Sequence, residues 1–147
     1  MSPIILRLTE SQHRIIIGSC YDGLPDEACG LLLGPMAAGP DGSVPSGRVT
    51  EARPCGNADA SARTYTVDPK DLLRAMRDAE ARGDEIVGVW HSHTHTDAYP
   101  SDTDVRQAVD PAWIYVIVSL KHGDPMLRAY RIADATITEL AVELDRD

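Results

Sequence analysis

The fold of this chain is decided by one apolar run and the polar segment after it: Ile86-Val87-Gly88-Val89-Trp90, then His91-Ser92-His93-Thr94-His95-Thr96-Asp97-Ala98-Tyr99-Pro100-Ser101-Asp102-Thr103-Asp104. The apolar run, bounded by Gly83-Asp84, predicts a buried strand. Residues two apart on an extended backbone point to the same side, so His91 and His93 should project together at the strand's end. Two imidazoles and the nearby Asp104 carboxylate suit a divalent metal, above all zinc, with the fourth tetrahedral position left for water.

A water activated by zinc also needs a base that takes its proton, and Glu27 is the candidate. It lies in Pro25-Asp26-Glu27-Ala28-Cys29-Gly30-Leu31-Leu32-Leu33-Gly34, at the start of an apolar strand. A carboxylate is costly to bury there unless it is paired or lies near a metal. Ser101 offers a hydroxyl that could donate a hydrogen bond to the oxyanion of a tetrahedral intermediate.

Together these residues resemble a known pattern. Glu27, His91-x-His93, seven residues, Ser101, two residues and Asp104 match the JAMM (MPN+) metalloprotease motif at every position. The flanking residues resemble its bacterial Mec-type branch, and the resemblance covers essentially the whole chain. It implies an MPN/JAB fold, similar to the cytidine-deaminase-like architecture, with Zn²⁺ as the cofactor. It also implies a partner, a small ubiquitin-like sulfur-carrier protein. The reaction would hydrolyse the amide bond after the carrier's C-terminal Gly-Gly and release cysteine for cysteine biosynthesis.

Several other interpretations compete with this one. The Ser101-x-x-Asp104 spacing is also that of a helix N-cap with an acidic third position, which is compatible with a ligand role for Asp104. An isopeptidase that removes ubiquitin-like carriers from lysines would use the same residues. A non-catalytic MPN scaffold usually lacks part of the metal set, which is complete here. A DNA-repair-associated JAMM relative is disfavoured by the acidic charge. The chain has no Gly-x-Ser-x-Gly for a serine hydrolase and no His-Glu-x-x-His.

Composition narrows the class of protein further. The 147 residues fit a single domain over 1–147, and the net charge of −9 disfavours binding to nucleic acid or to anionic membranes. The three cysteines include no Cys-x-x-Cys pair, which favours a reducing compartment. The sequence shows no signal-peptide pattern and no apolar run of the ~20 residues that a membrane span needs. We therefore expect a cytoplasmic protein.

The remaining pattern predicts an α/β (α+β) fold, a single mixed β-sheet with flanking helices. Helices should begin at the caps Thr9, Asp68 and Ser101, and Gly23 and Gly83 should end the first two in left-handed conformations. The second helix should bury an apolar stripe that contains Leu72, Leu73, Met76 and Ala79. Strands are expected over residues 4–8, 27–33, 48–53, 86–90, 113–120, 126–132 and 136–144, with a short extended piece over 64–67.

Two features have no single assignment. The 34–47 segment is rich in Gly, Pro and small residues, which is typical of a hairpin loop and also of a flap beside a substrate. His95 has the same parity as the other two histidines, but the chain should already be in a loop there. It is therefore either a residue that supports the site from the substrate side or an exposed one.

Overall fold

The computed structural model describes residues 4–36 and 46–147 and contains three helices and seven strands in those ranges. The helices are α1 (Glu10–Asp22), α2 (Pro69–Ala81) and α3 (Asp102–Gln107). The strands are β1 (Ile5–Thr9), β2 (Cys29–Pro35), β3 (Glu51–Cys55), β4 (Asp84–His93), β5 (Ile114–Ser119), β6 (Met126–Ala133) and β7 (Thr136–Asp145). Within this part of the chain, no helix is both long and apolar enough to cross a membrane.

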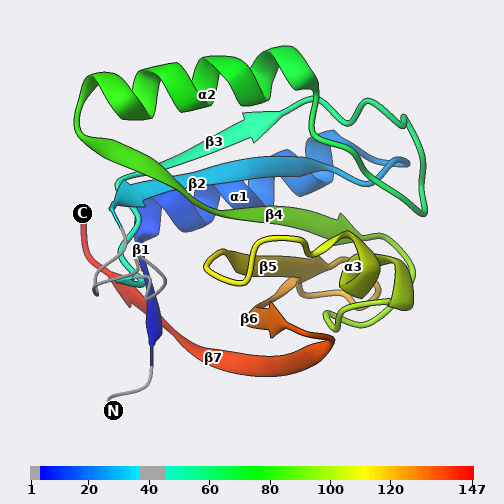
Figure 1. Cartoon of the computed structure of the whole chain (residues 1–147). Helices are drawn as coiled ribbons and strands as arrows, with labels where there is room; N and C mark the ends of the chain where they lie inside the picture. The colour runs from blue at the N-terminus through cyan, green and yellow to red at the C-terminus, as the bar shows by residue number, and fades with distance from the viewer. Residues whose placement is uncertain (1–3, 37–45) are drawn as a thin grey trace.

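The strands form one mixed sheet in the order β1-β7-β6-β5-β4-β2-β3. The β1–β7 and β4–β5 pairs are parallel, and the other pairs are antiparallel. The sheet curls strongly, so that β1 at one edge approaches the segment that precedes β3, the strand at the other edge (Figure 1). Arg7 in β1 forms an isolated bridge with Arg48, and its N–H donates to the Gly47 carbonyl at 2.7 Å. The predicted fold, a single mixed sheet with flanking helices, is confirmed.

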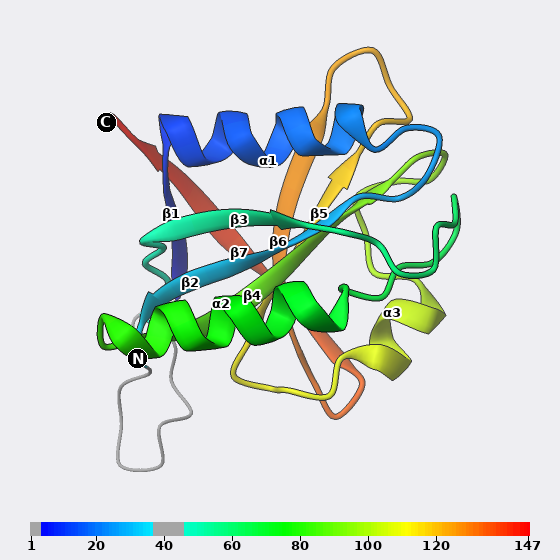
Figure 2. The ribbon, with the colours of Figure 1, turned by 90° about the horizontal axis from the view of Figure 1, so that it is seen from above.

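Helices α1 and α2 pack on opposite faces of the β2–β3–β4 part of the sheet (Figure 2). The core on the α1 side includes Leu8, Ile16 and Trp90, all fully buried. Trp90 packs so closely over Gly30 that a Cβ there would lie 2.1 Å from its ring. The core on the α2 side includes Leu31, Ala75, Ala79, Val89 and Ile117. The candidate site therefore lies on a strand that is covered from both sides.

A β-bulge in β4 decides which face each of its residues occupies. Leu33 of β2 pairs with Ile86, but the preceding Leu32 pairs with Gly88, so Val87 is the extra residue. Before the bulge Ile86 faces the α2 side, and after it Val89 faces that same side. The alternation then continues through His91 and His93. The bulge therefore directs both imidazoles to the face that carries α2 rather than to the α1 core.

The predicted helix beginnings are confirmed. Thr9 and Gln12 form a capping box, Asp68 caps α2 with Pro69 at its first position, and Ser101 caps α3. One predicted helix end is wrong: Gly23 is right-handed at φ −78°, because the chain continues from α1 into a further turn in which Asp26 N–H donates to the Gly23 carbonyl at 3.0 Å. Gly83 does adopt the left-handed conformation, at φ +78°.

Some boundaries and burial predictions also differ from the structure. Strand β4 continues through His93, so the histidines lie within the strand rather than after it. The 64–67 piece forms only a single bridge, at Val67. On α2, Leu73 and Met76 are about half exposed, because the two small residues Ala75 and Ala79 make the closest approach to the sheet. The predicted loop over 34–47 falls partly on residues 37–45, which lie outside the described residues.

Candidate active site

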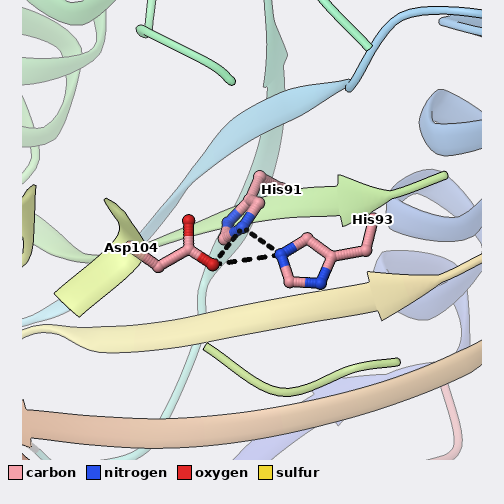
Figure 3. A group of neighbouring side chains, drawn as sticks. All are labelled: His91, His93 and Asp104. Carbon is pink, nitrogen blue, oxygen red and sulfur yellow. Dashed lines mark hydrogen bonds and ion pairs between the residues drawn. The ribbon is translucent and has the colours of Figure 1, made fainter. Parts of the chain in front are cut away.

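Strand β4 and helix α3 bring three of the predicted residues to one point. The Nε2 atoms of His91 and His93 lie 3.1 Å apart, and Asp104 Oδ2 lies 3.2 Å and 3.0 Å from them respectively (Figure 3). Both imidazoles are almost completely buried, and the Asp104 side chain is 11% exposed. Among the described residues, this is the one cluster of three or more His, Cys, Asp or Glu side chains with its ligand atoms close enough to hold an ion.

The geometry of the three atoms fits a small divalent cation. Ligands bound to zinc at 2.0–2.1 Å in a tetrahedral arrangement are about 3.3 Å apart, and the three observed separations are slightly shorter. A small outward movement of the side chains would therefore admit the ion. Two imidazole nitrogens and one carboxylate oxygen also form a typical donor set of catalytic zinc sites, which leave one position open.

Backbone groups orient two of the three side chains. The Asp97 carbonyl oxygen, which can only accept, lies 2.7 Å from His93 Nδ1, so that nitrogen carries a hydrogen and Nε2 is the atom left to bind an ion. Ser101 N–H donates to Asp104 Oδ2 at 2.9 Å, and Asp104 N–H donates to Ser101 Oγ at 3.1 Å. The helix cap and the candidate ligand are therefore parts of one arrangement, as the sequence allowed.

Burial and hydrogen bonds shift the pKa values of the three side chains in different directions. Burial would raise the pKa of Asp104, but hydrogen bonds from His91 and His93 outweigh it and hold that pKa well below its usual range. Burial lowers the pKa of His91, which keeps its imidazole neutral. Burial acts in the same direction on His93, where hydrogen bonds to Asp104 and Asp97 outweigh it and raise the pKa.

Glu27 lies next to this cluster, two residues before Cys29, where β2 begins to pair with β4. Ala28 N–H donates to Ser92 Oγ at 2.8 Å, and Ser92 N–H donates to the Ala28 carbonyl at 3.0 Å. Extending that pairing by one residue places Glu27 opposite His93. Its side chain is buried, and burial raises its pKa to about 7, with the charge of His93 opposing and that of Asp104 adding to the rise. A carboxylate with this pKa is suited to exchange protons near neutrality.

The other predicted or overlooked residues are distributed around the cluster. Ser101 is exposed at the start of α3, and its Oγ accepts from Asp104, which leaves its own hydrogen available. His95 is exposed in the loop after β4 and is not part of the cluster.

Sequence reasoning missed Tyr65, whose ring stacks on His91 with centroids 4.3 Å apart and planes 17° apart. It lies 26 residues before His91 in a stretch without a chemical motif, so no local signal identified it.

Comparisons with known proteins agree with the fold and place the chain in a family. The family model described as prokaryotic homologues of the JAB domain matches residues 9–133. A CysO-cysteine peptidase of Mycobacterium tuberculosis is 42% identical over 123 residues, which are 82% of this chain and 77% of that protein. A desampylase of Haloferax volcanii is 33% identical over 122 residues, 82% of this chain and 80% of that one.

Solved structures give the same result. A protein from Desulfitobacterium hafniense superposes with a TM-score of 0.83 at 32% identity, covering 96% of this chain and 93% of that one. A JAB1/MPN domain protein from Archaeoglobus fulgidus, 15% identical, shares the fold with a TM-score of 0.58, covering 97% of this chain and all of that one. The chain described here therefore belongs to the family of prokaryotic JAB-domain proteins, which includes JAMM-type hydrolases.

Proposed function

We propose that this protein is a zinc-dependent peptidase that releases cysteine from the C-terminus of a small ubiquitin-like sulfur-carrier protein. The observation that carries the proposal is the convergence of His91, His93 and Asp104 at 3.0–3.2 Å, with Glu27 buried beside them. The relatives named CysO-cysteine peptidase support the choice of substrate. The partner would be a carrier whose flexible tail ends in Gly-Gly followed by the residue to be removed.

Each residue of the candidate site would have a separate role in the proposed hydrolysis. A Zn²⁺ ion held by His91, His93 and Asp104 would supply Lewis-acid activation of water and of the scissile carbonyl. Glu27 would take the proton from the water and deliver it to the leaving amine, for which its pKa of about 7 is suitable. The Ser101 hydroxyl accepts from the Asp104 N–H and keeps its own hydrogen free, so it would donate to the developing oxyanion.

A groove between α1 and β3 supplies a path for the carrier's tail. It has a volume of about 580 Å³, reaches Glu27, and is lined by residues that include Ile15, Gly18, Asp22, Pro54 and Cys55. Strand β3 is an edge strand of the sheet. An extended peptide could therefore lie along this edge as an added strand. Because glycine has no Cβ, a Gly-Gly terminus would let its backbone approach the metal closely.

A second candidate is an isopeptidase that removes ubiquitin-like carriers from lysine side chains. The two desampylases, from Haloferax volcanii and Pyrococcus furiosus, favour it at 33% and 30% identity. The same residues would cleave either bond, so the leaving amine distinguishes the two functions. A non-catalytic scaffold is disfavoured, because the metal-binding set and Glu27 are all present.

The test is the intact mass of a ubiquitin-like sulfur-carrier protein whose tail ends in Gly-Gly-Cys, after incubation with this protein. Loss of one cysteine, blocked by a chelator and restored by zinc, is the expected result. The same carrier joined to a peptide lysine tests the second candidate.

Glu27→Gln should retain zinc and lose turnover by several orders of magnitude. If that variant loses its zinc as well, Glu27 is a ligand rather than the base.

A further inference from the structure

The loop over residues 56–67, between β3 and α2, contacts both His91 and Glu27 of the candidate site. Backbone groups orient His93 and Asp104, but neither of those groups contacts His91. The Tyr65 ring lies flat against His91, and the same loop holds the backbone on both sides of Glu27. We propose that Asn57 and Tyr65 of this loop are positioning residues, which fix His91 and Glu27 relative to each other. This inference rests on the proposed metal site.

The contact of Tyr65 with His91 has the geometry of a positioning contact. The ring centroids are 4.3 Å apart and the planes are inclined by 17°, so the tyrosine covers one side of the imidazole. His91 also contacts His93 edge-on, with centroids 4.9 Å apart. Rotation of the imidazole about its Cβ–Cγ bond would drive it into the Tyr65 ring. The Nε2 atom of His91 is therefore held toward the point where the other two ligand atoms meet.

Asn57 fixes the segment that presents Tyr65, because its side-chain amide makes four hydrogen bonds. Its Nδ2 donates to the carbonyls of Thr64 and Glu27, both at 3.0 Å. Its Oδ1 accepts from the N–H of Asp59 at 3.0 Å and of Thr66 at 3.1 Å. Two of these partners, Thr64 and Thr66, flank Tyr65 directly. A single amide thus connects the backbone of the candidate base to the residue stacked on a candidate ligand.

Other contacts of the loop act in the same direction. Glu27 N–H donates to the Ser61 carbonyl at 2.7 Å, so both backbone polar groups of Glu27 bind this loop. The Thr94 hydroxyl, one residue after His93, donates to the Ala62 carbonyl at 3.2 Å. The loop therefore joins the start of β2 to the end of β4, the two places from which the base and the histidines project.

The experiment measures metal affinity in the absence of any substrate, by competition between the full-length protein and a chromophoric chelator for Zn²⁺. Groups that orient metal ligands typically contribute 10–100-fold to affinity. We expect Tyr65→Leu to weaken zinc binding by about tenfold or more, while Tyr65→Phe stays within about twofold of the wild type. Tyr21→Leu, at a half-exposed tyrosine of α1, is the matched control and should bind zinc normally.

Two further variants keep the inference testable if Tyr65→Leu does not fold. Tyr65→Met keeps an apolar side chain without a flat ring and should also weaken binding. Asn57→Asp keeps the shape and the two acceptor bonds but places an oxygen opposite the carbonyls of Glu27 and Thr64. It should weaken zinc binding and alter the visible absorption of the Co²⁺-loaded protein, which reports ligand geometry.

The proposal would be overturned if Tyr65→Leu, or Tyr65→Met in its place, and Asn57→Asp both kept the wild-type zinc affinity and Co²⁺ spectrum. An equal loss in Tyr65→Phe would also overturn it, because that loss would assign the effect to the hydroxyl. Neither result depends on cysteine release.

Discussion

At the scale of single residues, Glu27 combines burial with a pKa raised from 4.5 to about 7. In metal-free protein this makes folding favour the protonated carboxyl, so wild-type stability falls as the pH rises from about 4.5 to 7. Glu27→Gln does not titrate and should be more stable than the wild type at pH 8, by up to about 3 kcal/mol. Urea denaturation with a chelator present, at pH 4 and pH 8, measures the difference.

The comparison at pH 4 is an internal control, because Glu27 is mostly protonated there in both the folded and the unfolded state and the variant should gain little. Asp22→Asn is the matched control on the surface, since its carboxylate is exposed at the end of α1. A Gln variant with the same advantage at both pH values would show that the gain comes from packing and not from the charge of Glu27.

At the scale of elements, helix α1 has a glycine in its interior that packing does not explain. A Cβ on Gly18 would meet no atom within 4 Å, yet the residue lines the groove that reaches Glu27. Gly18→Ala should therefore stabilise the protein by about 0.5–1 kcal/mol. Gly18→Leu should keep the fold but project into the groove, raising KM for the carrier at least several-fold. Thermal unfolding and steady-state kinetics test the two variants.

The alanine variant is the control for the leucine variant, because both remove the same glycine and only one fills the groove. We expect Gly18→Ala to keep KM close to the wild-type value. An unchanged KM in a well-folded Gly18→Leu protein would contradict the proposed path of the tail. It would not bear on the proposed metal site.

At the scale of the whole molecule, the candidate metal site joins β4 to α3 through Asp104, so an ion held there stabilises only the folded chain. Zinc at 100 times its Kd contributes about 2.7 kcal/mol. For a chain of this length that corresponds to roughly 5–10 °C in Tm. Calorimetry with and without a chelator should show this shift in the wild-type protein.

His91→Ala should abolish the response of Tm to the chelator, since one of three ligands is lost. His95→Ala should keep the response, because His95 is exposed and lies outside the cluster. A response of normal size in His91→Ala would place the bound metal elsewhere on the protein.

Much of the site could be predicted from the sequence because its spacing is local. His91 and His93 share a face through strand alternation, and Ser101 and Asp104 are joined by one helical turn. The three helix caps were likewise predictable, because a cap depends on residues within a single turn. These interactions join residues at most three positions apart, so the order of residue types was sufficient to identify them.

The rest depended on contacts between distant segments, which the order of residues does not determine. The face of the sheet to which the histidines point is decided by a bulge at Val87, which exists only because β2 pairs with β4. The pKa of Glu27 follows from burial by elements far along the chain. The stacking of Tyr65 on His91 spans 26 residues and depends on the Asn57 hydrogen bonds. The sequence by itself determined which chemical groups are present and how they alternate. The tertiary structure decided where they point and what surrounds them, because burial and stacking exist only once the chain has folded.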